Sequence, residues 1–506
     1  MSAHGSPLRG LHEAASDPAH EGRFGRMFKN LPVASYGGTD AENRENLAKL
    51  GKMMEADPDP AKDGADAEES AIPALNTYFG QFIDHDLTLG PEGVFQKIKD
   101  PKALIDFRTP AFDLDCVYGR GPGDQPYLFD GDKMLLGARL DGGSGAAWDL
   151  PRNSAVPARA LIGDPRNDEN TIVSQLQGLF LRFHNRLVDQ GMNFEQAQKA
   201  TQRHYQYVIL NDFLPQIVDS KVLDGLKTNE QFDSSKIKFY DWNRGKGHFP
   251  YMPIEFATAA YRFGHSMIRP GYRLNDGILL PIFDVNGPAF DLRGKQAMYA
   301  DRGIDWGRFI ATDTRPYDGA PGSAEQKRRL QYAYKIDSSL VNPLAHLPEN
   351  VAGDPPPSLA TRNLLRSLAF RLPSGQSVAR KMGLTPMVDD KIIIGKATGD
   401  PQDTQTPILQ ISPIFKDNCP LWTYILVEAA AHPASVSVMG APNNLVSTPR
   451  LGPVGGQIVA EVFLGLMFAD PTSLLGSDQG RSWKPMSPGF KLKDFVAFAA
   501  PTSSKA

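Results

Sequence analysis

Residues 75–87 constrain the fold more than any other stretch of the chain. Their apolar members recur three and four residues apart, as on the buried face of a helix; they are Leu75, Tyr78, Phe79, Phe82 and Ile83. Gln81, Asp84 and His85 share another face of the same helix. A histidine between two aspartates on a largely buried helix costs folding free energy unless those polar groups are used. We therefore predict a helix that carries a site; a hydrogen-bonded structural histidine is the alternative.

Helical periodicity recurs along the chain, whereas strict alternation of apolar and polar residues is scarce. The fold is therefore predicted to be mainly α, with little β structure. The candidate functional segments follow one another without an obvious linker, which favours one large catalytic domain over residues 71–475. An N-terminal extension with an acidic loop (1–70) and a C-terminal tail (476–506) complete the predicted organisation. The segments with helical periodicity are 171–188, 255–268, 360–372, 422–431 and 456–468.

Charge and composition exclude several classes of protein. The 506 residues carry 54 basic and 58 acidic side chains, net −4, without a basic block, so no nucleic acid or anionic membrane is expected as a partner. Residues 1–36 lack the apolar core of a secretion signal. The apolar stretch 458–469 contains Glu461 and is shorter than the roughly 20 residues of a membrane helix. With only Cys116 and Cys419, a disulfide framework is excluded. We expect a soluble, cytoplasmic protein, with leaderless export as the alternative.

Two later segments offer complementary chemistry. In Gly163-Asp-Pro-Arg-Asn-Asp-Glu169, Pro165 indicates a helix entry, where Arg166 can bring a fixed positive charge to a developing anion. An ordinary capping turn is the alternative. In Ala259–Ile268, Gly264 removes a side chain beside His265, which leaves room for a large planar group. Glycine in a helix interior costs about 1 kcal/mol relative to alanine, and a bound ligand would offset that cost. His265 then becomes a candidate iron ligand opposite His85; a structural histidine is the alternative.

A fourth segment, Thr361–Pro373, contains Asn363. A histidine that ligates haem iron needs a partner for its second ring nitrogen, and the carbonyl oxygen of an asparagine can accept that hydrogen bond. Asn363 is therefore a candidate partner of His265. By contrast, His184, in the amphipathic run Arg182–Leu187, is expected to be structural.

These segments, in this order, resemble the animal-type haem peroxidases, the peroxidase-cyclooxygenase superfamily that includes myeloperoxidase and lactoperoxidase, and most closely their bacterial relatives. The resemblance covers roughly residues 72–470. It is carried by four motifs: Gly-Gln-Phe-Ile-Asp-His-Asp, Gly-Asp-x-Arg-x-x-Glu, Leu-Phe-Leu-Arg-x-His-Asn-Arg-Leu and Arg-Phe-Gly-His. It implies a mostly helical domain around a b-type haem.

The resemblance also implies roles for individual residues. His85 is the distal base, Gln81 lies beside it, and Arg166 is the distal arginine. His265 is the proximal iron ligand and Asn363 its hydrogen-bond partner. The remaining implied cofactor contacts are Arg262 in the Arg-x-Gly-His motif, Arg366 toward a haem propionate, and Asp84 and Glu169, whose counterparts can form ester bonds to haem methyl groups.

A calcium site is implied as well. The family pattern of a threonine and carboxylates ahead of Val-Tyr-Gly is met by Thr109, Ala111 through its carbonyl, Asp113 and Asp115, completed by Asp86. Hard oxygen ligands suit Ca²⁺, which takes six to eight of them. On local sequence alone, a solvated strand end is the alternative for Asp113 and Asp115.

The predicted function is therefore a haem peroxidase that reduces hydrogen peroxide and oxidises small organic donors, halide or thiocyanate, with a role in the response to oxidative stress. One alternative is a fatty-acid dioxygenase of the same superfamily, which needs a tyrosine three residues before the proximal histidine. That position is Arg262 here, and Tyr261 lies about 100° away around a helix. A second alternative is a low-turnover haem protein with an adhesive or sensory role. The oligomeric state is left open.

Overall fold

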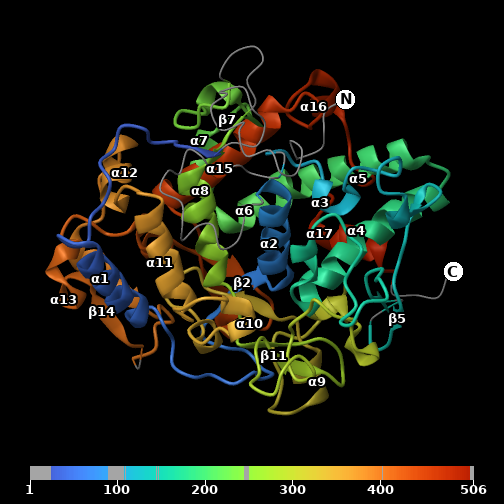
Figure 1. The fold of residues 1–506 in the computed structure, drawn as a ribbon, viewed down its shortest axis with the longest axis horizontal. Coiled ribbons are helices and arrows are strands. Elements are labelled where there is room, and N and C mark those ends of the chain that lie inside the picture. The colour runs from blue at the N-terminus through green and yellow to red at the C-terminus, as the bar shows by residue number, and fades with distance from the viewer. Residues whose placement is uncertain are drawn as a thin grey trace.

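The computed structural model describes residues 24–501 except 89–107, 109, 144, 146, 244–249 and 402. Helices dominate these residues and surround a central helix, α2 (Leu75–Leu87), as Figure 1 shows. The mainly α prediction is confirmed. The other long helices are α1 (Asp40–Met53), α4 (Thr171–Asp189), α5 (Phe194–Val208), α11 (Leu359–Ala369), α12 (Gly375–Lys381), α14 (Leu421–Ala430), α15 (Pro453–Ala469) and α17 (Leu492–Ala499).

The strands of the described residues pair only two by two. The pair β1 (Phe24–Gly25) and β9 (Met252–Pro253) is parallel. The others are antiparallel: β2 (Glu69–Pro73) with β12 (Tyr332–Tyr334), β3 (Phe129–Asp130) with β4 (Lys133–Met134), β5 (Arg139–Leu140) with β6 (Ala147–Trp148), β7 (Lys227–Thr228) with β8 (Gln231–Phe232), β10 (Gly271–Arg273) with β11 (Leu279–Pro281), β13 (Ile393–Gly395) with β14 (Gln405–Pro407), and β15 (Pro433–Ser437) with β16 (Leu445–Pro449).

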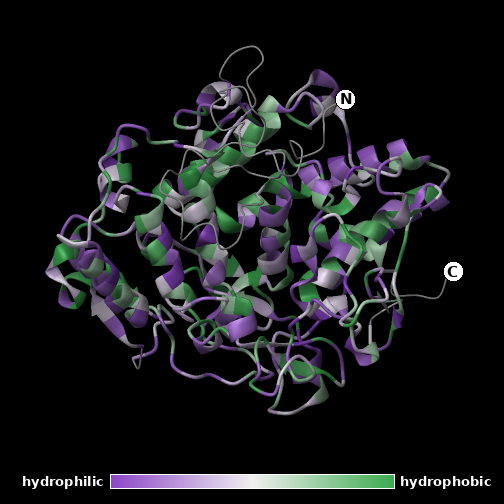
Figure 2. Ribbon diagram, in the orientation of Figure 1, coloured by the Kyte–Doolittle hydropathy of each residue, from purple (hydrophilic) through white to green (hydrophobic). Residues whose placement is uncertain are grey.

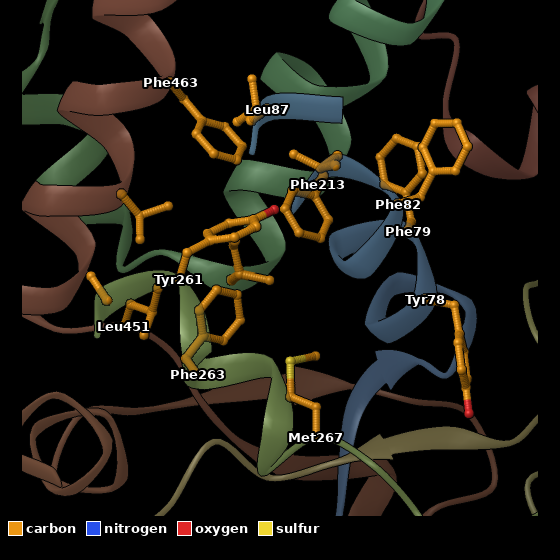
Figure 3. Close-up of a cluster of buried hydrophobic side chains, with 14 of the residues drawn as sticks. Tyr78, Phe79, Phe82, Leu87, Phe213, Tyr261, Phe263, Met267, Leu451 and Phe463 are labelled. Atoms are coloured by element: carbon orange, nitrogen blue, oxygen red, sulfur yellow. The ribbon is translucent and has the colours of Figure 1, made fainter. Parts of the chain in front are cut away.

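Helix α2 is held in the core by aromatic side chains on its apolar face. Phe82 stacks on Phe180 of α4, with ring centroids 4.3 Å apart, and Phe79 meets Phe213 edge to face at 5.5 Å. Figure 3 shows this cluster continuing to Tyr261 and Phe463. Such pairs contribute about 0.5–1.5 kcal/mol each beyond their buried area. The apolar stripe read from the sequence therefore fixes the rotation of α2, and with it the direction of its polar face.

Helices α14 and α15 complete the core. Most of their residues are buried, and Figure 2 shows α15 mostly hydrophobic, whereas the outer helix α5 is largely hydrophilic. Glu428 of α14 accepts hydrogen bonds from Val454 N and Gly455 N (2.9 and 3.1 Å), which satisfies donors in the first turn of α15. Within the part of the chain that the structure describes, no helix combines the length and the apolar character needed to span a bilayer.

The termini of the described chain pack on the same body. Helix α1 lies against α11, and α17 lies against α4, where Phe495 stacks on Phe183 with centroids 4.1 Å apart. Both helices fall in segments that the sequence assigns to an extension and a tail. The division at residues 70 and 475 stays a prediction.

Four of the five predicted helical segments are found as α4, α11, α14 and α15. The fifth, 255–268, is wrong as a single helix. It forms a short helix, α8 (Ile254–Thr258), and a 3-10 turn, η7 (Ala260–His265), separated at Ala259 (φ −134°, ψ −69°). The Arg262 Nε atom donates to the Ala257 carbonyl at 2.9 Å, a carbonyl that a continuous helix would pair with a backbone N–H. Gly264 therefore lies in a 3-10 turn, and the helix-interior cost does not apply.

Candidate active site

Helix α2 and the turn η7 face each other across a cavity with about 1270 Å³ of empty space, its open mouth included. All but one of the residues predicted for catalysis and cofactor binding line this cavity. The exception is Asn363, which is fully buried and contacts His265. The predicted residues in the wall are Gln81, Asp84, His85, Arg166, Glu169, Arg262, His265 and Arg366. The structure thus brings together residues that lie as far apart in the chain as Gln81 and Arg366.

His85 is held in one orientation by an asparagine that sequence reasoning missed. Its Nδ1 atom lies 2.7 Å from Asn167 Oδ1, and the Asn167 amide donates to Gln177 Oε1 at 2.9 Å. Because the Asn167 oxygen accepts, Nδ1 carries the hydrogen and Nε2 keeps its lone pair. A signal for Gln177 was present in the sequence, since it is a polar residue on the apolar face of α4.

Glu169 and Gln81 lie beside His85. Glu169 Oε1 is 4.0 Å from His85 Nε2 and accepts a hydrogen bond from the Gln81 amide. Burial lowers the pKa of His85 to about 4, and the positive charge of Arg166 adds to the effect. His85 is therefore a neutral imidazole near pH 7, with an acceptor nitrogen next to a carboxylate.

Arg166 lies in the 3-10 turn η4 (Pro165–Asp168), just ahead of α4, close to the predicted helix entry. Its Nη2 atom donates to Asp164 Oδ2 at 2.8 Å and to the carbonyls of His85, at 2.9 Å, and Thr88. Among the described residues Nη1 has no hydrogen-bond partner. Although burial opposes ionisation, the nearby guanidinium groups lower the pKa of Asp164 well below its usual range. The arginine is thus anchored on one side by a permanent carboxylate.

Gly163 permits this arrangement by a close approach of two backbones. A Cβ atom at Gly163 would lie 2.6 Å from the carbonyl oxygens of both Asp115 and Cys116. Any side chain there would push the turn that carries Arg166 away from α3 (Asp115–Tyr118). The glycine of the Gly-Asp-x-Arg motif is therefore a packing requirement.

On the opposite wall, Asn363 Nδ2 lies 2.8 Å from His265 Nδ1. The contact between the two residues matches the prediction, but the amide faces the ring through its nitrogen, not its oxygen. The oxygen is taken by Arg366, whose Nη1 donates to Asn363 Oδ1 at 2.6 Å. Burial lowers the pKa of His265 well below its usual value, and Arg262 and Arg366 add to this. His265 is neutral, as a metal ligand must be.

Arg262 connects the two walls, because its Nη1 lies 3.5 Å from Asp84 Oδ2 on α2. Tyr261 also lines the cavity and belongs to the aromatic cluster, where it stacks on Phe256 at 4.8 Å with its hydroxyl beside Phe213 (Figure 3). His184 lies outside the cavity, bonded to Tyr118 Oη (3.1 Å) and the Asp132 carbonyl (2.8 Å), as a structural histidine should be.

The cavity fits a planar iron cofactor. It has a neutral imidazole on each wall, and two arginines near His265 can pair with carboxylate substituents. A Cβ atom added at Gly264 would meet no heavy atom of the described residues within 4 Å, so the position beside His265 is open. These are the donors and the space that a haem requires.

A cluster of carboxylates lies behind α2. Ligand oxygens of Asp86, Asp113 and Asp115 are all within 4.8 Å of one another. Asp86 Oδ1 is buried and has no hydrogen-bond partner among the described residues, while burial and Asp115 raise the pKa of Asp86 to about 8. Asp115 begins α3 and is buried, so the alternative of a solvated strand end is wrong for it. Thr109 lies outside the described residues. We call the three aspartates the acidic site.

Comparisons with known proteins agree with this geometry. Residues 92–281 match the model of the animal haem peroxidase family. The chain is 30% identical over 190 residues to a peroxidase of Drosophila melanogaster (33% of this chain, 26% of that protein), and 26% over 216 residues to a chorion peroxidase of Aedes aegypti (36% and 27%). It is 27% identical over 211 residues to thyroid peroxidase of Homo sapiens (35% and 21%). The chain thus covers about a quarter of these relatives' length.

Solved structures extend the similarity over the whole fold. Peroxidase A of Dictyostelium discoideum superposes with a TM-score of 0.63 at 16% identity, over 96% of this chain and 94% of that chain. A fatty acid alpha-dioxygenase of Arabidopsis thaliana gives 0.52 at 14% identity, over 96% and 79%. The family match includes Arg166 and His265. Over residues 92–281 the chain is therefore similar to the animal haem peroxidase family.

Proposed function

We propose that this protein is a haem peroxidase that reduces hydrogen peroxide and oxidises small organic donors, halide or thiocyanate. The observation that carries the proposal is the distal histidine: His85 has Nδ1 fixed by Asn167 and Nε2 beside Glu169, in one cavity with His265. Binding a cofactor at His265 would not need this second, oriented base.

His265 would hold a b-type haem, with Asn363 behind the imidazole and Arg366 and Arg262 near the carboxylate groups of the cofactor. When bound, haem supplies the electrons and the iron coordination position that peroxide reduction requires. Asp84 and Glu169 line the same cavity, and we propose them as the residues that could form ester links to it. At present Asp84 pairs with Arg262 and Glu169 with Gln81.

The distal residues would move the proton. His85 Nε2 accepts a proton from the proximal oxygen of hydrogen peroxide and returns it to the departing oxygen, a task that needs the neutral ring described above. Arg166, through the donors on Nη1, stabilises the negative charge that develops on that oxygen. Gln81 and Glu169 fix the polar edge of the pocket beside Nε2. The anchored positions of both groups mean that little reorganisation is needed during the reaction.

The acidic site is proposed to bind Ca²⁺, with the Ala111 carbonyl and Thr109 as further ligands. Three carboxylates converging in a buried place repel one another, and a dication removes that repulsion. Because Asp86 follows His85 on α2, the ion would also help hold the distal histidine. We further propose a cytoplasmic location and a role in the response to oxidative stress.

The test is the variant His85→Ala in the haem-loaded protein. The Soret band should be retained, while the second-order rate of reaction with peroxide in stopped-flow spectra should fall by about 10²–10⁴-fold. His346→Ala, at an exposed histidine, is the control and should react like the wild type. An unchanged rate in His85→Ala would contradict the assigned role.

Two outcomes would favour the alternatives. Oxygen uptake with linoleate in the absence of peroxide would indicate a dioxygenase, whose fold is similar. The position three residues before His265 is occupied by Arg262 and not by a tyrosine, which argues against that reaction. Guaiacol turnover equal to that of free haem would indicate a haem protein of adhesive or sensory role.

A further inference from the structure

A buried chain of charges joins the acidic site to the active-site cavity. Arg108 Nη1 lies 3.0 Å from Asp115 Oδ1, and Arg108 Nη2 donates to Asp164 Oδ2 at 2.7 Å. The same Asp164 oxygen accepts from Arg166 Nη2 at 2.8 Å. One guanidinium is thus shared between two carboxylates, and one carboxylate between two guanidinium groups.

The chain is shielded from solvent along its whole length. The exposed fraction of the side chain is 3% for Asp115, 8% for Arg108, 0% for Asp164 and 13% for Arg166. In such surroundings interactions between charges are strong and poorly screened by salt. A change of charge at one end is therefore felt at the other.

We propose that Arg108 and Asp164 couple cation binding at the acidic site to the hold on Arg166. This rests on the proposed function, in which the acidic site binds Ca²⁺ and Arg166 serves the distal pocket. A dication beside Asp115 repels Arg108 and competes for the carboxylate, so that Arg108 turns its hydrogen bonds toward Asp164. Asp164 then holds Nη2 of Arg166 less strongly, so the hold on this guanidinium depends on the cation. Arg108 and Asp164 are positioning residues that act through Arg166.

Coupling between two sites is reciprocal, so it can be read from Ca²⁺ affinity alone. In Asp164→Asn, Arg108 loses its ion pair with residue 164 and binds Asp115 more strongly. This should weaken Ca²⁺ binding at the acidic site. Arg166→Gln lets Asp164 draw Arg108 away from Asp115 and should strengthen it. Neither Asp164 nor Arg166 belongs to the acidic site. Opposite signs at two neighbouring residues are not expected from general loosening of the structure.

The experiment is calorimetric titration of Ca²⁺ into the haem-loaded, full-length protein after chelation and desalting, at one fixed pH. We expect affinity changes of about fivefold or more, in the two directions stated. In the Arg108→Gln background both changes should disappear. Asp168→Asn is the matched control, because Asp168 lies in the same η4 turn and is buried against a different arginine, Arg152. It should bind Ca²⁺ like the wild type.

Several results would overturn the proposal. They are unchanged affinity in both variants, shifts in the same direction, shifts that persist with Arg108→Gln, or an equal shift in Asp168→Asn. If Asp164→Asn does not fold by circular dichroism, the tighter binding expected of Arg166→Gln decides the question. Failure of the wild type to bind Ca²⁺ would also overturn the coupling. The peroxide reaction of wild type and His85→Ala is measured separately, so the two failures are distinguishable.

Discussion

The two walls of the cavity fix their histidines in different ways. On the distal wall His85 is oriented by Asn167, which is oriented by Gln177 on the same rigid helix α4 that follows the turn. On the proximal wall His265 meets Asn363, whose amide is oriented by Arg366, a residue that itself lines the cavity. The orientation of the His85 ring is therefore set by neighbouring side chains that do not contact a cofactor carboxylate. The proximal arrangement depends on a side chain that a cofactor carboxylate could claim.

This contrast explains the unexpected amide orientation at Asn363. With Arg366 bound to Asn363 Oδ1, the amide presents its nitrogen to His265, and Nδ1 must accept. If a propionate takes Arg366, the amide is released to turn its oxygen toward the ring. We therefore expect the proximal wall to reach its proposed hydrogen bond only with the cofactor in place, whereas the hydrogen bond between His85 and Asn167 is already formed.

The largest expected effect is a difference in haem retention between a variant of the proximal wall and a variant of the distal wall. His265→Ala should lose nearly all the Soret absorbance of the protein after gel filtration, because the proposed iron ligand is gone. His85→Ala, prepared with the same haem supply, should keep it. Equal retention by the two variants would show that the assignment of proximal and distal walls is wrong.

The next effect tests the hydrogen bond between Asn167 and His85 on the distal wall. Asn167→Leu removes the acceptor that keeps the hydrogen on Nδ1 of His85, and the stopped-flow rate with peroxide should fall about 10–100-fold with the Soret band intact. Asn167→Asp keeps an acceptor oxygen and should lose less. A rate for Asn167→Leu equal to the wild-type rate would mean that the preset hydrogen bond does not matter.

A substitution on the proximal wall should change the affinity for haem and the properties of the bound haem, and it should leave the proton transfer step unchanged. Asn363→Leu removes the partner of His265, and haem affinity measured by transfer to apomyoglobin should fall about 10-fold or more. The reduction potential of the retained haem should shift as well. Asn342→Leu, at an asparagine outside the cavity, is the control. If the peroxide reaction slowed while haem affinity and reduction potential stayed the same, the assignment of Asn363 to the proximal wall would be contradicted.

The smallest effect concerns the distal wall alone. Removing Ca²⁺ with a chelator should lower the melting temperature by a few degrees, since an ion held at 100 times its dissociation constant stabilises by about 2.7 kcal/mol. The Soret band, which depends on the proximal ligand, should remain. Loss of haem on chelation would show that the acidic site supports both walls.

Much of the site was predictable because its signals are local. Periodic apolar residues gave α2 and α4, and the order of four motifs gave His85, Arg166 and His265. The interruption of helix 255–268 was not predictable, since it involves a hydrogen bond from the Arg262 side chain to the Ala257 carbonyl. Asn167 was missed because nothing in its own turn shows that its side chain reaches a residue 82 positions away.

The sequence by itself determined the class of fold, the buried face of each long helix and the residue types brought to the cavity, because periodicity and motif spacing are written in neighbouring residues. Only the tertiary structure decided which atom each side chain offers: the Asn363 nitrogen toward His265, and Arg108 between Asp115 and Asp164. The physical reason is that hydrogen-bond partners are chosen by competition among polar groups that meet only after the chain has folded. Such competition depends on distances across the core, which no local pattern records.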